Sequence, residues 1–269
     1  MDNRAVGVFD SGLGGLTAVR QLRAILPSEN IIYFGDTSRV PYGGRSREIL
    51  LKFARQDVRF VRSFDIKAVL VACGTVSTNA LAELQQENDL PVLGVVEPAC
   101  RRAARITRTR RVGVIATAAS VRTGAYAAAV RRFDSGIEVV SCACPLFVPL
   151  VENGRYRLGD PVVETVAREY LTPLRESGID VLIMGCTHYP LLSEVIGSVM
   201  GSGVTLIDTG AEAARELKET LTRQDALCAP RQGQSQYYVS DRPEDFGALA
   251  QQFLSQAVSA VQQIDIERY

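Results

Sequence analysis

Short apolar runs rich in β-branched residues alternate with helix-like segments along almost the whole chain. The clearest helical segment is 48–64, where apolar side chains recur every three or four residues. Continuous apolar strands separated by helices are typical of a parallel sheet covered on both faces, and such sheets bind ligands at the carboxyl ends of their strands. The expected strands are residues 5–9, 31–34, 67–72, 92–95, 111–116, 137–141, 181–184, 204–207 and 237–239.

Two strand-and-loop units occur twice in the same order. Residues 4–11 (RAVGVFDS) align with 110–117 (RRVGVIAT), and residues 66–73 (IKAVLVAC) align with 179–186 (IDVLIMGC). A single match between two α/β strands carries little weight, but two ordered matches, each ending on a hydroxyl or a thiol, favour an internal duplication. We therefore expect an α/β fold of two pseudo-symmetric domains, each with a mainly parallel sheet flanked by helices, and an active site in the cleft between them.

The two copies also predict where the domains divide. The first domain is expected to comprise residues 1–97 plus 204–269, and the second domain residues 98–203. The strand at 204–207 and the helix after it have no counterpart in the second copy of the repeated unit. We therefore expect both of them to return to the first domain.

Composition narrows the classes of function. The chain has 30 basic and 30 acidic residues, and this zero net charge favours neither nucleic acid nor a membrane surface as a partner. No segment has the length of a membrane span and nothing resembles a signal peptide, so we expect a cytoplasmic protein whose six cysteines are reduced thiols. The single histidine excludes a multi-histidine metal site, and no metal is expected.

Cys73 and Cys186 each end an apolar strand and precede a helical segment. Because the N-terminus of a helix favours an anion, this position is expected to lower the pKa of a thiol from about 8.5 toward neutrality. Free cysteines are usually small buried hydrophobic residues. Two of them at equivalent ends of a repeated unit indicate a shared role in one cleft.

Two thiols that face each other allow several chemistries. A redox disulfide is possible but lacks the Cys-x-x-Cys spacing, and a zinc site needs further ligands such as His188 with Cys142 or Cys144. Covalent catalysis by one thiol leaves the other unexplained. Proton transfer uses both, because a thiolate can remove the Cα proton of an amino acid on one face while a thiol delivers a proton to the other. The residues therefore favour racemisation.

Other polar residues follow the expected strands. Asp10 either assists a thiol or caps the next helix, and His188 either orients Cys186 or is a structural histidine. Glu152 either faces the cleft or forms a surface salt bridge. The turn at 40–44 offers backbone N–H groups to a carboxylate, and three threonines serve as donors to a substrate carboxylate or as helix caps, namely Thr75, Thr117 and Thr187.

Several motifs resemble the glutamate racemases of bacteria. The similarity runs from about residue 5 to residue 254, and its motifs are GVFDSGLGGLT at 7–17, YFGDT at 33–37, RVPYG at 39–43, PLFVPLVE at 145–152 and GCTHYPLL at 185–192. The resemblance implies interconversion of L- and D-glutamate without a cofactor. It also implies a supply of D-glutamate for peptidoglycan, hence for cell wall biogenesis and cell shape, by a cytoplasmic homodimer.

The family pattern implies a role for each site residue. Cys73 and Cys186 become the two proton donors and acceptors, assisted by Asp10, Glu152 and His188. The residues placed around the substrate are Asp10, Ser11, Tyr42, Gly43, Gly74, Thr75, Thr187 and His188.

The chain departs from the family at one position. Residues 72–77 read ACGTVS where the family usually reads ACNTAS, so Gly74 replaces an Asn that would hydrogen-bond the substrate. Losing a hydrogen bond to a charged group costs about 1.5–3 kcal/mol unless water or a backbone N–H replaces it. An aspartate racemase, or one for another acidic amino acid, is therefore an alternative, and a non-catalytic amino-acid-binding paralogue is an alternative from another class.

Overall fold

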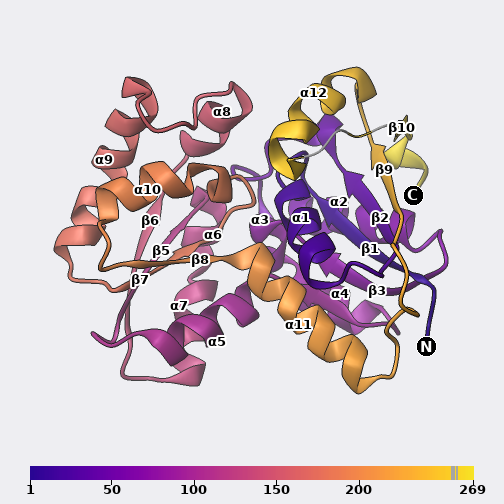
Figure 1. Cartoon of the computed structure of the whole chain (residues 1–269), viewed down its shortest axis with the longest axis horizontal. Coiled ribbons are helices and arrows are strands. Elements are labelled where there is room, and N and C mark those ends of the chain that lie inside the picture. The colour runs from indigo at the N-terminus through magenta and orange to yellow at the C-terminus, as the bar shows by residue number, and fades with distance from the viewer. Residues whose placement is uncertain (256–257, 259) are drawn as a thin grey trace.

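The computed structural model describes residues 1–255, 258 and 260–269. Two α/β halves lie side by side in Figure 1. In the described residues the strands form a six-stranded sheet of order β10-β9-β2-β1-β3-β4 and a four-stranded sheet of order β6-β5-β7-β8. Every pair of neighbouring strands is parallel. The predicted α/β fold with mainly parallel sheets is confirmed.

All nine expected strands form, with ends within two residues of the expected ones. The three-residue β10 was not expected, because its sequence, Val-Gln-Gln, carries no apolar run. The strands are β1 (Ala5–Asp10), β2 (Ile31–Gly35), β3 (Ile66–Val71), β4 (Val92–Gly94), β5 (Arg111–Ala116), β6 (Glu138–Ala143), β7 (Val181–Met184), β8 (Thr205–Asp208), β9 (Ser235–Val239) and β10 (Val261–Gln263).

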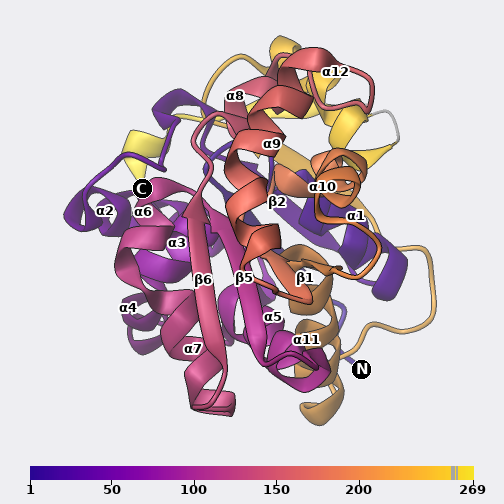
Figure 2. The same cartoon turned by 90° about the vertical axis from the view of Figure 1, so that its left-hand side faces the viewer.

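Helices cover both faces of each sheet, as continuous apolar strands require. In the first half α2 and α4 pack on one face and α1 lies on the other; in the second half α5 and α7 oppose α9 and α10 (Figures 1 and 2). The helices are α1 (Leu16–Ile25), α2 (Arg47–Val61), α3 (Gly74–Asn79), α4 (Leu81–Glu87), α5 (Val96–Ile106), α6 (Ala118–Thr123), α7 (Ala125–Phe133), α8 (Phe147–Glu152), α9 (Pro161–Glu176), α10 (Ser193–Met200), α11 (Thr209–Arg223) and α12 (Pro243–Leu254), with 3-10 turns η1 (Thr37–Arg39), η2 (Tyr189–Leu192) and η3 (Ile266–Arg268).

The strand order agrees with the internal duplication. The order β2-β1-β3-β4 in the first sheet matches β6-β5-β7-β8 in the second, so the repeated units on β1 and β5, and those on β3 and β7, occupy equal positions. β8 is then the counterpart of β4. Thr205 begins β8 113 positions after Val92 begins β4, which is the offset that also separates Cys186 from Cys73.

The prediction that the strand at 204–207 returns to the first domain is wrong. β8 pairs with β7 in the second sheet, from Val181 opposite Thr205 to Met184 opposite Asp208. The chain returns to the first half only with α11, which packs against α1. The repeat was missed at this strand because its counterpart β4 has only three residues. The rest of the domain division stays a prediction.

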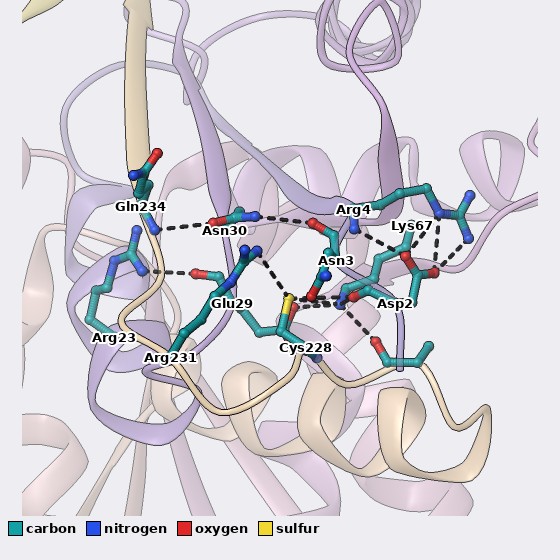
Figure 3. A network of polar contacts seen from close by, with 11 residues as sticks. Asp2, Asn3, Arg4, Arg23, Glu29, Asn30, Lys67, Cys228, Arg231 and Gln234 are labelled. Carbon is teal, nitrogen blue, oxygen red and sulfur yellow. Dashed lines mark hydrogen bonds and ion pairs between the residues drawn. The ribbon is translucent and has the colours of Figure 1, made fainter.

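A polar network stabilises the first half at the edge opposite the carboxyl ends of its strands (Figure 3). The buried Lys67, at the start of β3, lies 2.6 Å from a carboxylate oxygen of the equally buried Glu29. Its ammonium group also donates hydrogen bonds to the carbonyl oxygens of Asp2 (2.6 Å) and Ala226 (2.7 Å). The Glu29 carboxylate in turn accepts from the backbone N–H of Cys228 at 2.8 Å. The network therefore joins the N-terminal segment to the loop between α11 and β9.

Candidate active site

A cavity of about 440 Å³ lies where loops after the carboxyl ends of both sheets meet. The loops after β1, β3, β5, β6 and β7 contribute to its wall. This agrees with the expectation that parallel sheets bind ligands at the carboxyl ends of their strands. Candidate residues from the sequence line this cavity, among them Ser11, Tyr42, Gly43, Cys73, Gly74, Thr75, Thr117, Glu152, Cys186, Thr187 and His188.

The two thiols come from equivalent positions of the two halves. Cys73 follows β3 directly and is the N-cap residue of α3, and Cys186 follows β7 after one glycine. Both residues line the cavity and both are buried, with 4% and 7% of their surfaces exposed. Water is thus largely excluded from two sulfur atoms that share one cavity.

The electrostatic environment of Cys73 differs from the sequence-based expectation. Burial, together with the nearby carboxylate of Asp10, raises the pKa of the Cys73 thiol to about 12. Hydrogen bonds from the backbone of Val76 and from Ser11 act in the opposite direction but are outweighed. The expected pKa near neutrality is therefore wrong for Cys73, because the six-residue helix α3 stabilises a thiolate less than burial destabilises it.

His188 links Cys186 to Glu152. Its Nε2 lies 3.0 Å from the Oε1 of Glu152, and its Nδ1 lies 3.9 Å from the Sγ of Cys186. Burial alone lowers the pKa of this imidazole, but the hydrogen bonds to Cys186 and Glu152 outweigh burial and raise the pKa to about 10. At neutral pH the ring is therefore an imidazolium whose two N–H groups face the carboxylate and the sulfur. Of the two alternatives for Glu152, the structure supports the first: its side chain lines the cavity, and its ion-pair partner is the buried His188.

Asp10 lies behind the cavity wall and is fully buried. Its Oδ2 accepts hydrogen bonds from the backbone N–H groups of Gly12 (3.1 Å) and Gly15 (2.9 Å), in the turn that leads into α1. Its Oδ1 has no partner among the described residues, and burial raises the pKa of the carboxyl group. The capping contacts are present, and the carboxylate also lies close enough to Cys73 to affect its pKa.

Tyr42 contributes its backbone to the cavity, since its hydroxyl is engaged elsewhere. The phenol donates to Asp36 and lies 3.2 Å from a carboxylate oxygen of Asp57. The carbonyl oxygens of Tyr42 and Gly43 accept from the backbone N–H groups of Arg45 and Ala119. The backbone N–H groups of the turn are therefore its candidate donors to a ligand, as expected for residues 40–44.

Threonine hydroxyls connect the loops around the cavity. The Oγ1 of Thr75 lies 3.0 Å from that of Thr117, which belongs to the other half. Thr117 also caps α6 through the backbone N–H of Ser120, and the Oγ1 of Thr187 lies 3.4 Å from the Nδ1 of His188. These groups thus combine donor and capping positions, the two alternatives that the sequence left open.

Sequence reasoning missed part of the wall. Val148 and Pro149 of α8, with Cys144 and Pro145 in the loop after β6, form an apolar side of the cavity, whereas the sequence had suggested Cys144 only as a possible zinc ligand. The signal was available, because these residues also follow the carboxyl end of a strand. In the part of the chain that the structure describes, no three or more His, Cys, Asp or Glu side chains are arranged to hold a metal ion. No helix in that part has the length and apolar character needed to span a membrane.

Two parallel-sheet halves, with a thiol at the end of an equivalent strand in each, meet at one cavity, and the comparisons with known proteins give the class of enzyme. The family model described as Asp/Glu/Hydantoin racemase matches residues 17–217, and the chain belongs to this family. Within the family it groups with the glutamate racemases, at 47% identity to the one from Geobacter metallireducens over 98% of this chain and 97% of that relative.

Solved structures agree with this assignment. The glutamate racemase isoform RacE1 from Bacillus anthracis is similar with a TM-score of 0.94 and 36% identity, covering 98% of both chains. The glutamate racemase from Francisella tularensis, solved in complex with D-glutamate, is similar with a TM-score of 0.92 and 37% identity over all of both chains. The predicted resemblance to glutamate racemases is confirmed.

Proposed function

We propose that the chain interconverts L- and D-glutamate, with Cys73 and Cys186 acting on opposite faces of the substrate Cα and without a cofactor. The observation that carries this proposal is the meeting of two buried thiols, from equivalent strands of two sheets, in one cavity. The membership in the racemase family and the relatives named glutamate racemase support the same reaction.

The proposed chemistry is a balanced exchange of protons. The thiolate on one face removes the Cα proton, and the thiol on the other face donates its proton to the opposite side of the same carbon. No electron is gained or lost, and the two sulfurs end with their protonation states exchanged, so the reverse reaction uses the same groups. General acid–base steps of this kind contribute about 10²–10⁴-fold each.

The neighbouring residues support the two thiols in this proposal. The imidazolium of His188, held by Glu152, offers a proton and a positive charge to the side of Cys186. Asp10 supplies negative charge near Cys73 and stabilises the ammonium group of the substrate. The substrate carboxylates are proposed to bind Ser11, Thr75 and Thr187 and the peptide N–H groups at Tyr42, Gly43 and Gly74.

The test is activity of the purified protein on each enantiomer, followed by circular dichroism with no cofactor added. The optical signal of either enantiomer should decay to that of the racemate. Cys73→Ser and Cys186→Ser should each lower kcat by about 10²–10⁴-fold, and one of them should still exchange the α-hydrogen of a single enantiomer with solvent deuterium. An optical signal that never decays supports the non-catalytic amino-acid-binding alternative, and near-normal turnover in both variants contradicts the roles of the thiols.

Because Gly74 replaces the Asn that is usual in the family, aspartate is the substrate to compare with glutamate. Assays with both enantiomers of aspartate and of glutamate give the ratio of their kcat/KM values, and we expect glutamate to be favoured. A higher value for aspartate would assign the chain to the alternative reaction.

The cellular role follows from the proposed product. We propose that the chain works in the cytoplasm as a homodimer and supplies D-glutamate for peptidoglycan, hence for the cell wall and cell shape. Depletion of the chain in its host should then be rescued by D-glutamate in the medium, and light scattering should give twice the mass of one chain.

A further inference from the structure

The turn at residues 40–44 lies between the cavity and a buried cluster of charged side chains. All five residues of the turn line the cavity. No helix or strand includes residues 40–46, so the position of the turn depends on side-chain contacts and on a few backbone hydrogen bonds. Tyr42 is 2% exposed, and its phenol donates to Asp36 and lies 3.2 Å from a carboxylate oxygen of Asp57. The phenol therefore attaches the turn to the buried cluster.

Arg39 connects the two carboxylates of this cluster. Its Nε lies 2.6 Å from the Oδ2 of Asp36, and its Nη2 lies 3.0 Å from the Oδ1 of Asp57. Its Nη1 donates to the Oε1 of Gln56 at 2.6 Å, and its guanidinium carbon lies 4.1 Å from the ring centroid of Phe53. A guanidinium can hold two carboxylates at once because its donors form a planar fork. The Arg39 side chain thus fixes Asp36 and Asp57 relative to each other.

The two carboxyl groups depend on this cation. Asp36 and Asp57 are both fully buried, whereas Glu267, the third acidic partner of Arg39, is largely exposed. Burial and the nearby charge of Asp36 raise the pKa of Asp57, and the charge of Arg39 opposes that rise. Without the guanidinium, two buried acidic groups would lie side by side with no counterion, which is unfavourable. They would then move apart or admit water, and either change would displace the Tyr42 phenol.

We propose that Arg39 is a positioning residue that sets, through the two buried carboxylates and the Tyr42 phenol, where the backbone N–H groups of the turn lie in the cavity. The proposal rests on the proposed function, in which the N–H groups at Tyr42 and Gly43 bind a carboxylate of the substrate. Arg39 lies outside the cavity wall, so it acts through the turn and touches no substrate. The two thiols follow other strands. A displaced turn should therefore weaken binding of glutamate more than it slows proton transfer.

The expected signature is a loss of affinity with little loss of turnover. Arg39→Lys keeps the positive charge but lacks the planar fork, so it can hold only one of the two carboxylates firmly. Its KM for glutamate should rise by about 10-fold, as expected when hydrogen bonds to a charged group are weakened. Its kcat should stay within about threefold, because a contact made equally in the ground state and the transition state affects KM alone. A merely structural role would lower the temperature of thermal unfolding and leave the KM of the folded protein unchanged.

A double-mutant cycle tests the route through the phenol. Tyr42→Phe removes the hydroxyl and keeps the ring, whose centroid lies 5.5 Å from that of Phe53. If Arg39 acts through this hydroxyl, Arg39→Lys should raise KM by a smaller factor in the Tyr42→Phe background than in the wild type. Equal factors in the two backgrounds would overturn the proposed route.

The matched control is Arg55→Lys on α2, the helix that also carries Asp57. The Arg55 guanidinium pairs with Glu87 at the surface, and both side chains are about 40% exposed. Exposed pairs contribute little, so KM, kcat and thermal unfolding should equal those of the wild type. If Arg39→Lys does not fold, Arg39→Lys/Asp57→Asn takes its place. This variant has one cation for one buried carboxylate and should show the same rise in KM.

The outcomes separate this proposal from the proposed function. A wild-type protein that neither racemises nor binds glutamate overturns both. If it binds glutamate without racemising it, only the proposed function fails, and the Kd from calorimetry replaces KM in the same comparison. An active wild type whose folded Arg39→Lys variant has an unchanged KM, or a loss confined to kcat, overturns the role of Arg39 alone. A raised KM with near-normal kcat, and a smaller rise in the Tyr42→Phe background, supports it.

Discussion

His188 is the only histidine in the chain, so its NMR signal needs no assignment among others. Its pKa of about 10 exceeds the ordinary value of 6.5, although burial alone would lower it, because of the hydrogen bonds to Cys186 and Glu152. We expect the imidazole signal of the wild type to titrate near pH 10 and that of Glu152→Gln to titrate at lower pH. A titration near 6.5 in the wild type would contradict the charged state assigned to this ring.

The same shift predicts how stability depends on pH. The folded pKa of His188 lies above its unfolded value, so the stability from the charged ring is complete below about pH 6.5 and is lost as the pH rises to about 10. Urea unfolding at several pH values should show this decline in the wild type and a smaller one in Glu152→Gln. Equal slopes in the two proteins would show that Glu152 does not stabilise the imidazolium.

Helix α11 carries the chain from the second sheet back to the first half, and Asp208 begins it. The Oδ1 of this residue accepts from the backbone N–H groups of Gly210 (2.8 Å) and Ala211 (3.2 Å). Loss of such a cap costs about 1 kcal/mol. Asp208→Ala should therefore lower the free energy of unfolding by about that amount in urea titrations, whereas Asp208→Asn, which keeps an acceptor oxygen, should lose less. Equal losses in both variants would mean that capping is not the reason.

Strands and helices were predictable where the pattern of neighbouring residues is enough to identify them. The strands with apolar runs were located within two residues, and the carboxyl-end rule placed both thiols in one cavity. The destination of β8 was not predictable, because pairing with β7 is a tertiary contact and its counterpart is short. The pKa of Cys73 was wrong for a similar reason: burial depends on every element packed around the sulfur, and the sequence shows only the helix that follows.

At the scale of the whole molecule, the pair of Lys67 and Glu29 connects segments that are far apart in the chain. Removal of one partner from a buried ion pair costs about 3–5 kcal/mol, since the remaining charge is left unpaired. Lys67→Met should lower the free energy of unfolding by about this amount. The kcat should stay unchanged, because the pair lies at the amino ends of the strands and the cavity at their carboxyl ends.

The control for this prediction is the double variant Lys67→Met/Glu29→Gln. With no charge left in the buried site, it should recover part of the stability lost in the single variant. A double variant less stable than Lys67→Met would show that the charge of Glu29 is compensated by other groups.

The pairing of β2 with β9 places Ile31 beside Ser235, 204 residues later in the chain. On the ribosome β2 therefore emerges long before the strand that covers its outer edge, and the whole second half is synthesised in between. An uncovered strand edge of apolar sequence invites pairing with other chains. A nascent or truncated chain that ends before Ser235 should accordingly depend on chaperones and aggregate without them, although every group of the cavity has already been made.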